Sequence, residues 1–96
     1  MKLVIIAYGE ALDREVLGVV AGAGAENYTK WTRVQGKGTG SGPHLGSPVW
    51  PKHNNVVAVA VDDAQAARIL EGVRELRSRP DNIGVKAFVV PIEAAT

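Results

Sequence analysis

A glycine-rich segment between residues 34 and 53 carries most of the candidate chemistry of this chain. Its closely spaced glycines let several backbone N–H groups point at one anion, and Lys37 and Ser41 add side-chain donors. Arg33 adds positive charge at the base of the segment. No helix is predicted directly after it, so it matches neither the phosphate-binding P-loop nor the dinucleotide-binding fingerprint. We interpret it as an anion-binding loop; the alternative is a flexible hairpin loop whose glycines serve only the turns.

The same segment contains large apolar side chains. Leu45, Val49 and Trp50 stand among its glycines and prolines. A purely flexible linker seldom carries such residues, whereas a loop that docks on another protein does. A loop of this length in so small a domain is usually functional or disordered. We therefore predict that these three side chains contact a target protein.

Two histidines offer a second kind of site. His44 and His53, the only histidines of the chain, lie in or beside the glycine-rich segment. Neutral imidazoles bind zinc or copper, here with an acidic residue from elsewhere in the chain or from another subunit. Their spacing matches no zinc-finger pattern, and no cysteine accompanies them. A divalent-metal site is the resulting hypothesis, and two solvated loop histidines are the plainer alternative.

Catalytic patterns are poorly represented. Ser41 and Ser47 lack the context of a nucleophile elbow, and a histidine with an aspartate somewhere in the chain is no triad signature. Asp62 and Asp63 are better explained as the start of a helix. We therefore expect a protein that is not an enzyme.

Length and composition limit the class of protein. Ninety-six residues make one domain, and a formal net charge of +1 gives no general attraction to nucleic acid or to anionic membranes. The lack of cysteine excludes disulfides and thiolate metal sites. The apolar run after Lys2 is too short for a signal peptide, and no stretch approaches the roughly 20 apolar residues that cross a bilayer. We expect a cytoplasmic protein that is not inserted in a membrane.

Hydrophobic periodicity predicts six elements. Continuous apolar runs indicate buried strands, and apolar residues spaced three and four apart indicate helices that bury one face. The predicted elements are a strand at 2–8, a helix at 10–23, strands at 27–34 and 55–61, a helix at 64–78 and a strand at 84–92. Asp62 is predicted to cap the second helix, with Gln65 as its capping-box partner. The segment 35–54 is expected to form neither helix nor regular strand.

This order of elements is that of a ferredoxin-like βαββαβ plait: an α+β fold, here one domain over 1–96, with one antiparallel sheet and two helices on one face. The first and third strands, Leu3 to Ala7 and Val56 to Val61, are apolar on both faces, whereas half-exposed strands alternate apolar with polar residues. Another subunit is the simplest cover for the second face; the alternative is that small side chains are tolerated at the surface. Neither strand has an aromatic residue for base stacking, so nucleic-acid binding is not expected.

The pattern resembles the PII signalling superfamily. The predicted second strand ends in Val34-Gln35-Gly36-Lys37-Gly38, similar to a Val-x-Gly-x-Gly of that family, and a long segment follows. Gly84-Val85-Lys86-Ala87-Phe88-Val89 is similar to the family's Gly-Lys-Ile-Phe-Val stretch, in which the lysine contacts nucleotide phosphate. The resemblance implies a homotrimer with ligand sites between subunits. It also implies a T-loop, here 35–54, that meets a target protein such as a membrane transporter or a metabolic enzyme.

The resemblance is to a divergent member, because the loop is shorter and richer in glycine and proline, and the connection at 80–83 is also shorter. CutA-type proteins, which are linked to divalent-metal tolerance, share the trimeric plait. The aromatic second strand, with Tyr28 and Trp31, is loosely similar to theirs. A metal-binding protein of that type is therefore the alternative function, and a structural trimer without a ligand is the plainest one.

The leading interpretation combines these elements. The end of the second strand and the start of the last strand are expected to approach one another across a subunit boundary. That would place Gly36, Lys37 and Gly38, with Arg33 at the strand end, near Gly84 and Lys86 of a neighbouring chain. Two lysines and several backbone donors around one cleft would suit phosphate. We predict a PII-like regulator that binds a small anion, such as an adenine nucleotide, between subunits.

Overall fold

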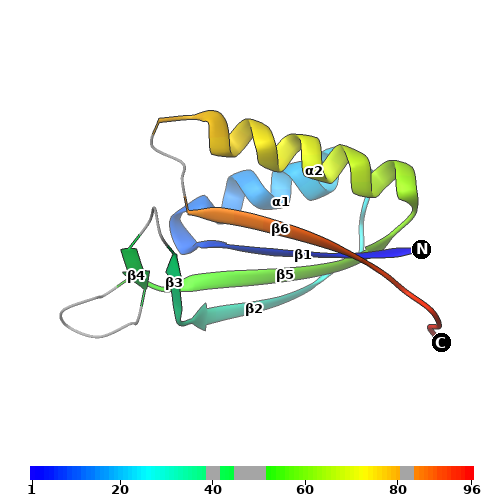
Figure 1. The fold of residues 1–96 in the computed structure, drawn as a ribbon, viewed down its shortest axis with the longest axis horizontal. Coiled ribbons are helices and arrows are strands. Elements are labelled where there is room, and N and C mark those ends of the chain that lie inside the picture. Colours follow the sequence, from blue (N-terminus) through cyan, green and yellow to red (C-terminus); the bar gives the residue numbers. More distant parts are fainter. Residues whose placement is uncertain (39–41, 45–51, 81–83) are drawn as a thin grey trace.

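A four-stranded sheet forms the centre of the fold. The structure is a computed structural model that describes residues 1–38, 42–44, 52–80 and 84–96. Its elements are β1 (Lys2–Gly9), the 3₁₀ turn η1 (Glu10–Leu12), α1 (Asp13–Gly22), β2 (Thr29–Val34), β3 (Gly36–Gly38), β4 (Gly42–His44), β5 (Asn54–Val61), α2 (Asp63–Ser78) and β6 (Val85–Pro91) (Figure 1). The predicted first helix thus opens with a tighter turn, as helix N-termini often do.

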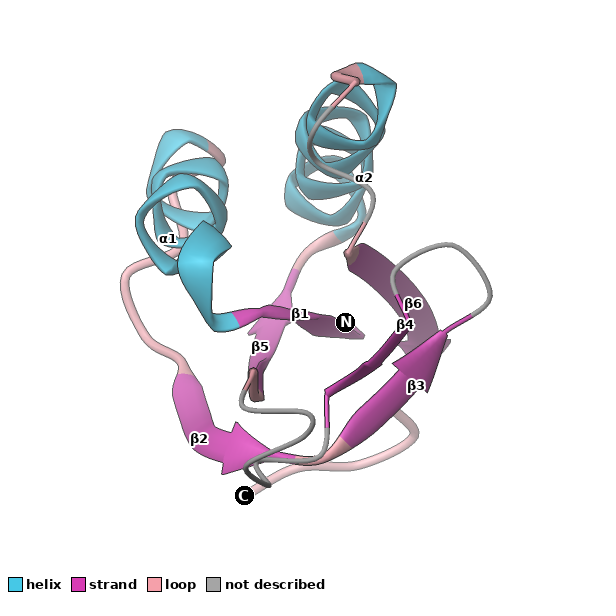
Figure 2. Ribbon diagram, turned by 90° about the vertical axis from the view of Figure 1, so that its left-hand side faces the viewer, coloured by secondary structure: helices cyan, strands magenta, loops and turns pink. Residues whose placement is uncertain are grey.

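Four strands form one antiparallel sheet in the order β2-β5-β1-β6. Both helices lie on the same side of this sheet (Figure 2). The predicted α+β, ferredoxin-like plait is therefore confirmed. Within the described ranges, neither helix is long and apolar enough to cross a membrane.

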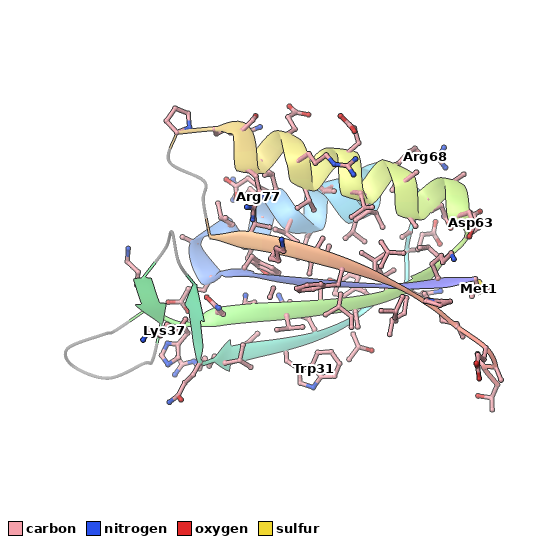
Figure 3. All side chains as sticks on the ribbon, viewed as in Figure 1. Met1, Trp31, Lys37, Asp63, Arg68 and Arg77 are labelled. Atoms are coloured by element: carbon pink, nitrogen blue, oxygen red, sulfur yellow. The ribbon has the colours of Figure 1, made fainter. Side chains whose placement is uncertain are left out.

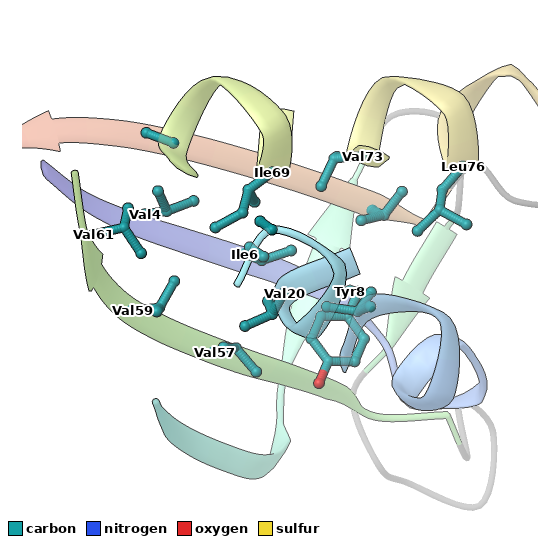
Figure 4. Packing of buried hydrophobic residues seen from close by; sticks show 14 residues of the cluster. Val4, Ile6, Tyr8, Val20, Val57, Val59, Val61, Ile69, Val73 and Leu76 are labelled. Atoms are coloured by element: carbon teal, nitrogen blue, oxygen red, sulfur yellow. The ribbon is translucent and has the colours of Figure 1, made fainter. Parts of the chain in front are cut away.

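The hydrophobic core lies between the helices and the sheet (Figure 4). Alternate residues of β1 and β5 point into it, as the period of two in a strand requires. Its fully or almost fully buried members include Val4, Ile6, Tyr8, Val57, Val59, Val16, Val20, Ile69, Val73 and Leu76. Burial of each aliphatic side chain of this size contributes about 1.5–3 kcal/mol, so the core holds the two layers together.

The predicted capping box at the start of α2 is confirmed. The Asp62 carboxylate accepts a hydrogen bond from the Gln65 backbone N–H at 2.7 Å, and the Gln65 side-chain oxygen accepts one from the Asp62 N–H at 3.1 Å. The Gln65 side-chain amide also donates to the Gly24 carbonyl at 3.2 Å. One glutamine therefore both starts α2 and ties it to the turn that follows α1.

The glycine-rich segment contains regular structure that we did not predict. Strands β3 and β4 pair in antiparallel register, with Gly36 opposite His44 and Gly38 opposite Gly42. The prediction of no regular strand was therefore wrong for these residues. Backbone hydrogen bonds make this pairing, and two three-residue strands, half of whose residues are glycine, leave no alternation of apolar side chains to read.

The face of the sheet away from the helices, called the open face below, is largely apolar. The register of β1 with β5 and β6 places Leu3 beside Val90 and Ala60, and Ile5 beside Phe88 and Ala58. Phe88 is 52% exposed and Val90 is 39% exposed in the single chain. Trp31, on β2, is 51% exposed and points away from the helices (Figure 3). The apolar character that the sequence predicts for both faces of β1 and β5 thus extends to parts of β6 and β2 on the open face.

Contact between the helices gives a first testable prediction. A Cβ at Gly72 of α2 would lie 2.6 Å from Cγ1 of Val19 in α1, while a Cβ at Gly18 would meet nothing within 4 Å. Alanine normally stabilises a helix interior over glycine by roughly 0.5–1 kcal/mol. We expect Gly18→Ala to show that gain. Gly72→Ala should instead lose about 1–3 kcal/mol, because Val19 is β-branched and cannot easily rotate away.

Urea unfolding of both variants, at the protein concentration used for the wild type, measures the two changes. Equal stabilisation by both substitutions would show that the helices are not in close contact at Gly72.

Candidate anion-binding site

A β-bulge at the end of β2 directs the chain towards the candidate site. Trp31 pairs with Val56, but Val34, three residues later, pairs with Asn54, so β2 has one residue more than β5 over this stretch. Arg33, within the bulge, has a φ of 56°. An L-residue adopts this left-handed conformation at a cost of about 1–2 kcal/mol. Regular alternation would have turned Val34 towards the helices. The extra residue places it on the open face instead.

Beyond the bulge, β3 and the start of β6 enclose a cleft at one end of the sheet. The cleft has a volume of about 680 Å³. Ala7, Val34 and Val56 form part of its wall, and Phe88 adds an aromatic ring. The described residues that line it therefore offer apolar surface beside the polar segment of β3.

Five of the six predicted ligand-binding residues line this cleft. They are Gly36, Lys37, Gly38, Gly84 and Lys86. We expected them to meet across a subunit boundary, but a single chain brings them together. Arg33 does not line the cleft and is exposed at the bulge instead. Their binding of a ligand stays a prediction.

The close approach of β3 to β5 explains one glycine of the segment. A Cβ at Gly36 would lie 2.1 Å from Nδ2 of Asn54, at the start of β5. Any side chain at residue 36 would displace Asn54, which itself lines the cleft. A larger residue at this position would therefore have to move the Asn54 side-chain amide out of its place in the cleft wall.

Arg77 is a lining residue that the sequence analysis missed. It lies at the carboxyl end of α2, where a cation also suits the helix dipole, and its Nη1 donates a hydrogen bond to the Val85 carbonyl. The sequence did contain a signal. Arg77 follows the buried Val73 by four residues, which places both on neighbouring positions of one helix face.

The charge of the cleft has one sign. Lys37 comes from β3, Arg77 from α2 and Lys86 from β6, and no carboxylate stands among the described lining residues. Lys37 and Arg77 lie at the same end of the molecule (Figure 3). The Lys86 ammonium lies 5.9 Å from the centre of the Phe88 ring, close enough for a weak cation–π attraction. Three cations, with no carboxylate in the described part of the wall, favour the binding of an anion in this cleft.

Most of the predicted metal-binding and partner-contact side chains lie outside the described residues. Leu45, Val49 and Trp50 lie outside the described residues, as does the side chain of His44. His53 is half-buried, and its backbone carbonyl accepts a hydrogen bond from the Glu10 N–H at 3.0 Å. Over the ranges that the structure describes, no three His, Cys, Asp or Glu side chains gather as a metal site would require. The metal site and the docking role stay predictions.

A partly buried polar network supports the floor of the cleft from the helix side. Asp13, the first residue of α1, accepts hydrogen bonds from the Tyr8 hydroxyl at 2.6 Å and from the Asn55 side-chain amide at 3.1 Å. The Lys30 ammonium pairs with the same carboxylate at 3.2 Å. Tyr8 and Asn55 directly follow Ala7 and Asn54, which line the cleft from β1 and β5. The network therefore ties three strands and α1 together behind the cleft.

Each member of the network shifts the ionisation of another. The Tyr8 hydrogen bond is the largest cause that lowers the pKa of Asp13, and Lys30 and Asn55 lower this pKa further. Burial raises the pKa of Tyr8 well above its usual value, and the Asp13 carboxylate adds to the increase. The charged aspartate and the neutral tyrosine are thus the forms that the fold favours.

The fold places the chain among the ferredoxin-like α+β proteins. The profile of the family "Nitrogen regulatory protein P-II" matches residues 1–96, and the chain belongs to this family. The predicted resemblance to the PII superfamily is therefore confirmed. The CutA-type alternative gains no support from this match, and among curated proteins none matches the chain at a significant level.

Solved structures agree with the family. A protein described as a PII-like signalling protein, from Thermus thermophilus, is 29% identical with a TM-score of 0.67, over 93% of this chain and 83% of that chain. CPII, a nitrogen regulatory PII-like protein from Thiomonas intermedia, bound to ADP, AMP and bicarbonate, is 19% identical with a TM-score of 0.77, over 99% and 92% of the two chains. Its apo form is 18% identical with a TM-score of 0.67, over 93% and 87%. The likeness to CPII shows a shared fold.

The polar network gives a prediction about pH. Tyr8→Phe should lower the free energy of unfolding by roughly 1–3 kcal/mol at pH 7, because the Asp13 carboxylate loses the hydrogen bond that the Tyr8 hydroxyl donates to it. The lowered pKa of Asp13 stabilises the fold above about pH 4, near the usual value of 3.8, and this stabilisation is lost as the pH falls through the lowered pKa. The difference between wild type and variant should therefore shrink below pH 4.

Urea unfolding between pH 2.5 and pH 7 measures this dependence. Tyr28→Phe, at an exposed tyrosine, is the matched control and should change stability by less than about 0.5 kcal/mol. A loss in Tyr8→Phe that stays constant with pH would contradict the coupling to Asp13.

Proposed function

We propose that this P-II family member is a cytoplasmic regulator that binds an adenine nucleotide in the cleft between β3 and β6. It acts as a homotrimer and contacts a target protein through the segment 35–54. Nucleotide binding in the cleft alters that segment, because β3 is at once the wall of the cleft and the beginning of the segment. A membrane transporter or a metabolic enzyme is the class of target that the family resemblance suggests.

The observation that carries this proposal is the set of three cations around one cleft. Lys37, Arg77 and Lys86 come from three different elements and face no carboxylate among the described lining residues. Charge-assisted hydrogen bonds from such groups are shorter and stronger than neutral ones. A volume of about 680 Å³ lies within the common range of small-molecule sites, roughly 300–1,000 Å³.

The apolar part of the cleft favours a nucleotide over a simple inorganic anion. Val34, Val56 and Phe88 offer surface for a base and a ribose beside the cations. CPII, which shares the fold, has been solved with ADP, AMP and bicarbonate. That finding supports the choice of adenine nucleotides, and of bicarbonate, as the first ligands to test here.

The open face supports the proposed trimer. Leu3, Ile5, Phe88 and Val90 form a continuous apolar surface across β1 and β6, and Ala58 and Ala60 extend it over β5. Exposed contiguous apolar surface of this kind usually marks an interface between proteins. Three copies that each bury this face would remove Phe88 and Val90 from water.

Assembly gives a prediction that light scattering can check. At micromolar concentration the measured mass should be about three times the chain mass of 10.1 kDa. Ile5→Lys, at the centre of the open face, should dissociate the assembly, because a buried unpaired charge is strongly unfavourable. Ala67→Lys, on the exposed side of α2, is the matched control and should remain assembled. A wild-type protein that is monomeric would remove the basis of the trimer.

Ligand binding gives another prediction. Calorimetry should detect ADP, ATP or AMP binding to the wild type, and Lys37→Ala and Lys86→Ala should each weaken it by about tenfold or more. Lys2→Ala, at the opposite end of β1, should change affinity by less than about twofold. If nothing binds the wild type below millimolar concentration, or if both cleft variants bind unchanged, the proposed site is wrong.

A further inference from the structure

Arg77 differs from Arg74 and Arg79, the arginines on either side of it in the sequence. Arg74 pairs with Glu71 at 3.3 Å and Arg79 with Glu75 at 3.9 Å, both on exposed positions. Such surface pairs contribute little. Arg77 instead lies at the wall of the cleft and donates to a backbone carbonyl of β6. No ion pair joins it to a carboxylate within the described part of the chain.

The hydrogen bond to Val85 holds the guanidinium of Arg77 at the cleft. Val85 is almost fully buried, and its position is fixed by pairing with Tyr8. A guanidinium carries five N–H donors in a rigid plane, so a single bond to one carbonyl leaves donors for another acceptor. A cation that is already held in place loses little side-chain entropy when it binds a ligand. Lys37 and Lys86 are exposed, as Arg77 is, and the hydrogen bond to the Val85 carbonyl is what distinguishes Arg77 from them.

We infer that Arg77 is a specificity-determining residue of the cleft, which binds the anionic group of the ligand through two parallel N–H donors while it holds the start of β6. This inference rests on the proposed nucleotide site. The ligand class that follows is one with two oxygens on one centre, a phosphoryl group above all, because the planar guanidinium matches that geometry. A lysine in its place would keep the charge but lose the paired donors.

Arg77 also links the ligand to the fold around it. The same guanidinium contacts β6 at Val85, one residue before Lys86, another cation of the cleft. A phosphoryl group bound by Arg77 would thus fix the end of α2, the start of β6 and the position of Lys86 together. Occupancy of the cleft should therefore stabilise the α2–β6 junction as well as the cleft wall.

Calorimetry with ADP on full-length variants tests the inference. Arg77→Ala should weaken ADP binding by about tenfold or more, and Arg77→Lys should also weaken it several-fold, although lysine can still donate to the Val85 carbonyl. Arg74→Ala and Arg74→Lys are matched controls on the same helix and should stay within about twofold of wild type. Arg77→Lys with wild-type affinity would overturn the role of the paired donors.

A spectroscopic readout separates direct binding from a structural role. In ¹⁵N-labelled wild type, the Arg77 Nε–Hε resonance should shift on addition of ADP, while the Arg74 resonance should not. If Arg77→Ala does not fold, Arg77→Lys and this resonance still decide the question. ADP binding that depends on Lys37 and Lys86, but leaves the Arg77 resonance and both Arg77 variants unaffected, would overturn this inference alone. A wild type that binds no nucleotide would overturn both this inference and the proposed function.

Discussion

The pairing of β1 with β5 and β6 fixes which side chains meet on each face of the sheet. In this register Tyr8 points to the helices and Ala7 to the cleft, although they are neighbours in the chain. A slip of one residue would exchange the two faces of β1 completely. Tyr8 would then lose Asp13, and the apolar core would lose Val4 and Ile6. The core, the polar network and the cleft therefore depend on a single alignment of backbone hydrogen bonds.

Polar contacts at opposite ends of the molecule reinforce this alignment. At the cleft end, the Asp13 carboxylate accepts from Tyr8 of β1 and Asn55 of β5, and pairs with Lys30 of β2. The Gly9 N–H also donates to the Gly84 carbonyl at 2.8 Å, which joins the end of β1 to the start of β6. At the other end, the Ile92 N–H donates to the Met1 carbonyl at 3.2 Å. Hydrogen bonds form only when donor and acceptor are correctly aligned. These polar contacts therefore fix the strand register more narrowly than apolar packing alone would.

The sequence was sufficient to predict the sheet, the helices and the capping box, because each depends on local periodicity or on residues three apart. The β3–β4 hairpin and the bulge at Arg33 were not predictable in this way. Both arise from backbone pairing, and glycine or an arginine at positive φ leaves no periodic signal. The role of Arg77 was missed for a different reason. Its hydrogen bond partner, Val85, follows the end of α2 by several residues, and only the folded chain brings the two together.

The bulge explains why the cleft forms beside the predicted ligand-binding residues. Without the extra residue at Arg33, Val34 would face the helices and the chain would enter β3 from the other side of the sheet. The strain at Arg33 is thus the cost of turning the glycine-rich segment across the end of the sheet. Ala7, Val56 and Phe88 lie on the open face and also line the cleft. A neighbouring copy that covered the open face would therefore reach the rim of the cleft, so assembly and ligand binding would influence one another through shared side chains.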